Sequence, residues 1–176
     1  MSDATPPRGI SLERHLDLRG RGRYLWSRRA VLVVLLVIVV AGLANVFGQH
    51  AQTSAAAGSA ASLDVRAPTR ARGGDIFTAR VRIQARTELK RATLNLDRGW
   101  FEGMTFNGSA PQATQESSVD GRTAFEFGDI PAGGSFVVFL SFQVNPNNVG
   151  HRSANVALSD GPRRIAVVDR SLTIWP

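Results

Sequence analysis

The sequence predicts a mainly β protein, with one N-terminal transmembrane helix followed by an antiparallel immunoglobulin-like β-sandwich of seven or eight strands. An uninterrupted apolar run covers Ala30–Ala44. From Leu63 onward, apolar residues recur at every second position, which is the period of a strand with one buried face. The pairs Asp120-Gly121 and Asp160-Gly161 separate such segments, and Asp-Gly favours tight hairpin turns.

Composition limits the functions open to the chain. It has 176 residues and no cysteine, which excludes a disulfide framework, a thiolate metal site and a cysteine nucleophile. Arginine makes up nearly all of its basic residues, and we read this bias as a sign of a GC-rich, actinobacterial genome. The net charge of +7 is densest in residues 1–29, which hold seven arginines against three acids. This indicates a basic tail rather than a nucleic-acid surface.

The N-terminal third predicts an oriented membrane anchor. Residues 1–23 read as a disordered arginine-rich cytoplasmic tail, and residues 24–48 as a transmembrane signal anchor. The apolar run extends through Phe47, and a helix of this length is about 27 Å long, close to the thickness of a bilayer core. Tyr24 and Trp26 occupy interfacial positions, and the basic residues before the span place the N-terminus in the cytoplasm and the C-terminal domain outside.

Two alternatives compete with parts of this prediction. Residues 27–32 partly resemble a twin-arginine export signal, and Ala55-Ala56-Ala57 offers an A-x-A cleavage site, so the chain could instead be a cleaved, secreted protein. The uncleaved anchor is preferred because the apolar run is longer than export requires and the A-x-A lies about ten residues beyond it. Within the tail, residues 10–18 could form a short amphipathic helix on the membrane surface.

Residues 49–62, QHAQTSAAAGSAAS, predict a low-complexity Ala/Ser/Gly linker that holds the domain off the bilayer. The β-sandwich domain is predicted to occupy residues 63–176. Its clearest amphipathic strand is 77–86, followed by strands near 92–97, 123–127, 135–144, 154–158 and 164–174. Strand 135–144 is apolar on both faces at its start, which is typical of a central strand.

One turn carries a resemblance to a known family. The segment Phe127–Ser135 reads FGDIPAGGS and precedes the long apolar strand, while Gly73-Gly74-Asp75 precedes the strand at 77–86. This layout resembles the DUF11/CARDB-like group of bacterial surface sandwiches, in which an I-P-A-G-x-S turn leads into a strand. The chain also resembles uncharacterised actinobacterial single-pass membrane proteins over most of its length. The resemblance implies an immunoglobulin-like extracytoplasmic domain and supplies no catalytic residues.

The sequence offers little for catalysis. The three histidines, His15, His50 and His151, are not spaced as metal ligands, and there is no calcium-loop motif. Only His151 lies within the predicted fold, and no G-x-S-x-G elbow accompanies it. We therefore predict a protein that is not an enzyme and uses no cofactor, metal or small-molecule substrate.

Two candidate contact surfaces remain. Arg80, Arg82 and Arg86 share one face of the strand at 77–86 and could bind an anionic cell-wall polymer or lipid headgroups, or could be an ordinary solvated face. The second candidate is a glycine-flanked group of large apolar residues, Trp100, Phe101 and Met104. These could contact a partner, or fold back to close one end of the sandwich.

The predicted function is a non-enzymatic, membrane-anchored extracytoplasmic interaction or structural module, with an accessory subunit of a cell-envelope complex as its specific form. Its partners would be the lipid bilayer, through the anchor, and another envelope or membrane protein. The alternative is a binding protein for an anionic cell-wall polymer or lipid headgroups. An extracytoplasmic location excludes nucleic acid as a partner.

Overall fold

The computed structural model describes residues 21–44, 46 and 49–176, and side chains from residue 25 onward. The predicted tail lies almost wholly outside these residues, as does the side chain of Tyr24. The chain divides into two compact units, Met1–Phe47 and Gly48–Pro176. Each unit is described by itself.

The described part of the first unit is formed mainly by the helix α1 (Arg21–Leu43). Its segment Leu25–Leu43 is long and apolar enough to cross a membrane, a test that a signal sequence also passes. More than half of each side chain from Val31 to Val40 is exposed. Exposing so much apolar surface to water is unfavourable, and this property is shared by membrane-spanning helices and signal sequences.

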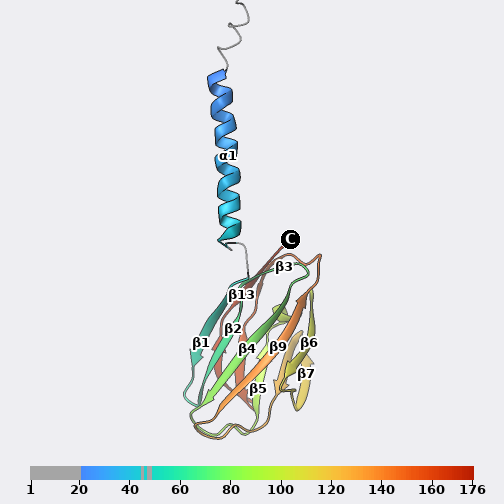
Figure 1. The fold of residues 1–176 in the computed structure, drawn as a ribbon. Helices are drawn as coiled ribbons and strands as arrows, with labels where there is room; N and C mark the ends of the chain where they lie inside the picture. Colours follow the sequence, from blue (N-terminus) through green and yellow to red (C-terminus); the bar gives the residue numbers. More distant parts are fainter. Residues whose placement is uncertain (1–20, 45, 47–48) are drawn as a thin grey trace, which may run out of the picture. The chain divides into compact units, whose positions relative to one another are not determined.

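The second unit is built from two five-stranded antiparallel sheets (Figure 1). The first has the order β1-β2-β4-β9-β6, formed by β1 (Ala51–Ala57), β2 (Ala61–Pro68), β4 (Ile76–Ala85), β9 (Ser135–Val144) and β6 (Met104–Ala110). The second has the order β12-β11-β5-β8-β7, formed by β12 (Arg163–Val168), β11 (Val156–Asp160), β5 (Ala92–Leu96), β8 (Arg122–Glu126) and β7 (Gln115–Val119).

A small third sheet and a short helix complete this unit. The sheet has the order β10-β13-β3, formed by β10 (Gly150–Ser153), β13 (Ser171–Trp175) and β3 (Arg70–Arg72). Strand β3 pairs with β13 in parallel. The one-turn 3₁₀ helix η2 (Arg98–Trp100) follows β5. The predicted class, mainly β with an N-terminal apolar helix and an antiparallel sandwich, is confirmed.

One hydrophobic core lies between the large sheets. In β4 the exposure alternates along the strand, so that Val81 and Ile83 are fully buried while Arg80 and Arg82 are exposed. Leu94 of the second sheet belongs to the same buried cluster. The period-two pattern in the sequence therefore marked the inward faces correctly.

Of the two predicted Asp-Gly turns, the first forms as expected. Asp120 and Gly121 join β7 to β8 with φ angles of 52° and 74°, both positive as a type I′ hairpin turn requires. The second turn is shifted by one residue: Asp160 ends β11 and pairs with Arg163, so the turn residues are Gly161, with a φ of 56°, and Pro162.

The predicted linker is wrong over most of its length. Residues 51–57 form β1, which pairs with β2 from Ala51↔Pro68 to Ala57↔Ser62, and Ala61 already belongs to β2. The sequence AQTSAAA has no large apolar residues to signal a strand. It becomes one because it pairs with the edge of a sheet whose other strands carry the core, so tertiary pairing overrides weak propensity.

The described residues form thirteen strands, more than the seven or eight predicted. The additional ones are short or polar, as in β3 (RAR), β10 (GHRS) and β7 (QESSV). All five residues of β7 are exposed. Such strands lack the alternation of large apolar residues by which a half-buried strand is recognised in a sequence.

Candidate functional site

The outer face of the first sheet brings together arginines from two strands. Arg80 lies opposite Arg66 of β2, and Arg82 lies opposite Asp64. With Thr53 of β1 these residues line a shallow hollow of about 150 Å³. None of the three arginines forms an ion pair within the part of the chain that the structure describes.

Apolar side chains continue this face on β9. Phe139 lies opposite Arg80, and Val137 lies opposite Arg82. Phe139 is 45% exposed, although β9 is an inner strand of its sheet. We call this surface the β4–β9 face and define it by Arg66, Arg80, Arg82, Val137 and Phe139. It places a cationic strip beside an exposed aromatic ring.

Arg86 stands apart from this group. It follows the end of β4, and its Nη1 donates to the backbone oxygen of Gly58 at 3.3 Å. Arg86 is not among the residues that line the hollow beside Arg80 and Arg82. The structure therefore brings together two of the three predicted arginines and adds Arg66, whose position next to Arg80 depends on the pairing of β2 with β4.

The predicted apolar contact group is mostly core. Trp100 is only 2% exposed and Met104 7% exposed, while Phe101 is partly buried against the core. The Trp100 Nε1 donates to the backbone oxygen of Ala154 at 3.0 Å. The Trp100 ring packs 5.2 Å from that of Phe142, between centroids. These three residues therefore form no exposed patch, because η2 turns Trp100 inward, where its N–H has a partner.

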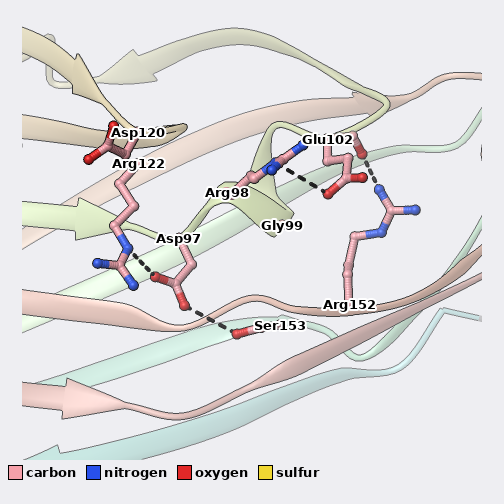
Figure 2. A pocket seen from close by; sticks show the side chains of 8 residues that line it. All are labelled: Asp97, Arg98, Gly99, Glu102, Asp120, Arg122, Arg152 and Ser153. Carbon is pink, nitrogen blue, oxygen red and sulfur yellow. Dashed lines mark hydrogen bonds and ion pairs between the residues drawn. The ribbon is translucent and has the colours of Figure 1, made fainter.

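A polar hollow of about 480 Å³ lies beside this turn (Figure 2). Its lining residues are mainly charged and come from η2 and the residues on either side of it, from the β7–β8 turn, and from β8 and β10. They are Asp97, Arg98, Gly99, Glu102, Asp120, Arg122, Arg152 and Ser153. The Asp97 carboxylate pairs with Arg122, with 3.2 Å between Oδ1 and Nε. Ser153 Oγ donates to Asp97 Oδ2 at 3.1 Å. Glu102 pairs with Arg98, with 3.7 Å between Oε2 and Nε.

The same hollow holds Arg152 in place through neutral partners. Its Nη2 donates to Asn148 Oδ1 at 2.8 Å, and its Nη1 donates to the backbone oxygen of Glu102. The polar surface then continues across the outer face of the second sheet, because Asp97 and Arg122 also line an adjacent hollow with Asn95 and Asn155. This surface offers hydrogen-bond donors and acceptors, and much of its charge is already paired internally.

The chemistry available in the polar hollow is limited. A serine nucleophile needs a base such as histidine to activate it, and the lining residues include none. His151 is exposed on β10, where its Nδ1 lies 2.9 Å from Thr173 Oγ1. Within the described residues, no three side chains of His, Asp or Glu are grouped as metal ligands.

One buried charge has a structural role. Arg170 is 7% exposed, and its guanidinium donates to the backbone oxygens of Val65 at 2.8 Å and Ala67 at 2.7 Å. Desolvation by burial lowers the pKa of Arg170 below its ordinary value. The contacts join the segment before β13 to β2, and so fix one side of the sandwich.

The exposure of Phe139 and the partners of Asp97 were not predicted from the sequence, for different reasons. The apolar outer face of 135–144 was visible in the sequence, but it predicted a buried central strand rather than an exposed ring. Asp97 was visible as an outward position after Leu96. Its proximity to Arg122 and Ser153 depends on strand order, which no local pattern encodes.

The fold is thus of the mainly β class, with sandwiched antiparallel sheets and an N-terminal apolar helix. No protein-family model matches the chain, and no curated protein matches it. Among solved structures, it is similar to CaCohA2 from Clostridium acetobutylicum, with 14% identity over 66% of this chain and 92% of that one, at a TM-score of 0.42.

Two further solved structures are similar at comparable levels. One is a non-cellulosomal cohesin from the archaeon Archaeoglobus fulgidus, with 10% identity over 71% of this chain and 92% of that one, at a TM-score of 0.39. The other is a FixG-related protein from Vibrio parahaemolyticus, with 13% identity over 58% of this chain and 82% of that one, at a TM-score of 0.32. The DUF11/CARDB-like resemblance and the actinobacterial origin remain predictions.

Proposed function

We propose that this chain is a non-enzymatic, membrane-anchored interaction module whose sandwich lies outside the cytoplasmic membrane and binds another envelope protein through the β4–β9 face. The observation that carries the proposal is the exposed Phe139 ring beside Arg80 on an inner strand. Aromatic residues and arginine are enriched among the residues that dominate protein interfaces.

The free energy gained by covering the exposed part of Phe139 supports a protein partner. A phenylalanine exposes about 200 Å² when free, so covering the exposed 45% of Phe139 removes about 90 Å² from water and contributes about 2 kcal/mol. The three neighbouring arginines add charge that a complementary acidic surface would pair. By contrast, the polar hollow already pairs Asp97 and Glu102 within itself, so a ligand there must compete with existing contacts.

The anchor in this proposal is uncleaved. The A-x-A at Ala55-Ala57 lies inside β1, and cleavage after Ala57 would remove the whole edge strand that covers β2. The arginines that precede the apolar run Ala30–Ala44 support a cytoplasmic N-terminus. A cysteine introduced at Ala132, an exposed turn residue, tests the orientation. A membrane-impermeant maleimide should label it in intact spheroplasts, and labelling only after lysis would contradict the proposal.

The interaction is tested by capturing the full chain from solubilised membranes with its partner. Phe139→Ser should reduce recovery of the partner at least severalfold. Val119→Ser is the matched control, since Val119 is 68% exposed on β7, and it should leave recovery unchanged. Equal recovery with both variants, at equal thermal stability, would contradict binding through the β4–β9 face.

A second candidate is binding of an anionic cell-wall polymer through the same arginines. The observation in its favour is that Arg66 joins Arg80 and Arg82, with only Asp64 to offset them in the hollow. Such binding would weaken steeply with salt, and the double variant Arg80→Gln, Arg82→Gln would abolish it while Phe139→Ser would not. Loss with Phe139→Ser, and not with the arginine variant, would exclude this alternative.

A further inference from the structure

Exposed apolar residues gather at one end of the sandwich. Among the described residues of the second unit, five large apolar side chains are exposed: Ile76, Val119, Phe139, Val149 and Trp175. Ile76 is 63% exposed, and Val149 and Trp175 are each 54% exposed. These three lie at the ends of β4, β10 and β13, whereas Val119 and Phe139 lie elsewhere.

Backbone contacts hold the three residues at the same end. Trp175 lies beside Arg72 in the parallel pair of β13 and β3, and its backbone oxygen accepts from the N–H of Gly73 at 3.0 Å. Ile76 follows directly after that turn. Val149 directly precedes Gly150, which lies opposite Ile174. Figure 1 shows the C-terminus beside β3, in agreement with these contacts.

Cationic side chains border this apolar group. Arg70 and Arg72 are exposed and share one face of β3, while Ala71 between them is buried. The acid in the adjoining turn, Asp75, is already engaged, because its Oδ2 accepts from the N–H of Arg72 at 2.8 Å. We call Ile76, Val149, Trp175, Arg70 and Arg72 the Trp175 end.

The chain enters the sandwich at the same place. The Gln49 Nε2 donates to Asp75 Oδ2 at 2.6 Å, which holds the first described residues of the second unit against the Gly73–Asp75 turn. The apolar segment suited to a membrane ends at Leu43. Five residues separate Leu43 from Gln49, and the six Cα–Cα steps between them span no more than about 22 Å even when fully extended. Covalent geometry alone therefore keeps the point of entry within reach of the surface of any bilayer that α1 crosses.

We propose that the Trp175 end rests in the headgroup region of the bilayer that holds the anchor, with anionic phospholipid as its ligand. This inference rests on the proposed anchor. Tryptophan favours the interface between membrane and water, since its ring is apolar and its N–H is polar. Arg70 and Arg72 match the phosphate groups of such lipids in charge and geometry. Ile76 and Val149 supply apolar surface on either side of Trp175.

The absence of cysteine from the chain makes single-site labelling direct. The full chain is reconstituted in vesicles of phosphatidylcholine and phosphatidylglycerol, with an environment-sensitive fluorophore at Ile76→Cys or Val149→Cys. The controls are Val119→Cys, an exposed apolar position on β7, and Ala132→Cys, in the turn before β9. Since all four positions are exposed or nearly so in the sandwich, thermal unfolding should be alike for all four proteins.

The inference predicts a blue-shifted emission and severalfold weaker quenching by iodide at positions 76 and 149, together with stronger quenching by headgroup-labelled lipid. Positions 119 and 132 should remain open to iodide. Trp175→Ser in the Ile76→Cys background should restore iodide quenching, and omitting phosphatidylglycerol should restore part of it, since the two arginines then lose their anionic ligands.

Three results would overturn the inference, and they are distinguishable. If positions 76 and 149 are as open to iodide as position 132 while the chain resists alkaline extraction, the lipid contact is wrong and the anchor stands. If alkali extracts the chain from the vesicles, the anchor fails and the inference fails with it. If the two positions are shielded in native membranes but open in vesicles of lipid alone, the Trp175 end binds a protein rather than the bilayer.

Discussion

The clearest stability prediction concerns Trp100, because the chain carries a matched control for it. Trp100 is 2% exposed and Trp175 is 54% exposed, so the same substitution can be made once in the core and once at the surface. Trp100→Ala removes the ring packed against Phe77 and Phe142, with centroid separations of 6.4 and 5.2 Å. It also leaves the backbone oxygen of Ala154 without its indole donor.

The magnitude follows from the buried area. An aromatic side chain buries roughly 150–250 Å², which at about 25 cal/mol per Å² corresponds to about 4–6 kcal/mol. Measured substitutions of buried tryptophan by alanine cost about 3–5 kcal/mol because the site relaxes in part. A domain of this size has a total stability of about 5–15 kcal/mol. Trp100→Ala should therefore remove a large share of it, whereas Trp175→Ala should change it by less than about 0.5 kcal/mol.

The assay is urea unfolding of the full chain in mild detergent, followed by the far-ultraviolet circular dichroism of the sheets. The midpoint should fall sharply for Trp100→Ala with little change in the slope, and should stay in place for Trp175→Ala. Equal midpoints for the two variants would refute the placement of Trp100 in the core, and would return it to the exposed contact group that the sequence also allowed.

Three further predictions concern the sandwich. Gly58→Ala should destabilise it, because the added Cβ would lie 2.3 Å from the backbone oxygen of Ile165. Ser59→Ala is the control and should leave the melting temperature unchanged. Equal melting temperatures for the two variants would contradict the placement of β1 and favour a linker there. Gly99→Ala should lower the stability at least as much, since its Cβ would lie 1.7 Å from the backbone oxygen of Ser153. A melting temperature equal to that of the parent chain would contradict the close approach of η2 to β10. Arg170→Met should lower the free energy of unfolding in urea by about 3 kcal/mol, because each hydrogen bond from a charged donor contributes about 1.5–3 kcal/mol. Arg163→Met, at the exposed start of β12, should be nearly neutral. Equal losses of stability for the two variants would contradict the buried role of Arg170.

Prediction from sequence succeeded where a single strand carries its own signal. The alternation in 77–86 identified both faces of β4, and Asp120-Gly121 identified its hairpin without knowledge of any other strand. It failed for β1, where alanine and serine encode no preference and the pairing with β2 decides the structure. The membership of Arg66 in the β4–β9 face likewise depends on the pairing of β2 with β4, which the residues around Arg66 do not specify.

Phe139 shows a different limit of prediction from the sequence. Its apolarity was evident, and a strand apolar on both faces is usually covered on both. Among the residues that the structure describes, no element covers this ring enough to bury it, and it remains 45% exposed. A sequence pattern can show that a side chain favours burial, but it cannot show whether the same chain or a partner provides the cover.

Binding of an envelope protein through the β4–β9 face can be tested by site-specific photo-crosslinking in native membranes. A photoreactive amino acid is placed at Val137 on the β4–β9 face, and at Ser117 on the exposed strand β7 as the control. We expect one discrete protein adduct from position 137, lost when Arg80→Glu is added, and none from position 117. No adduct from position 137, or the same adducts from both positions, would contradict the claim that the sandwich binds an envelope protein through this face.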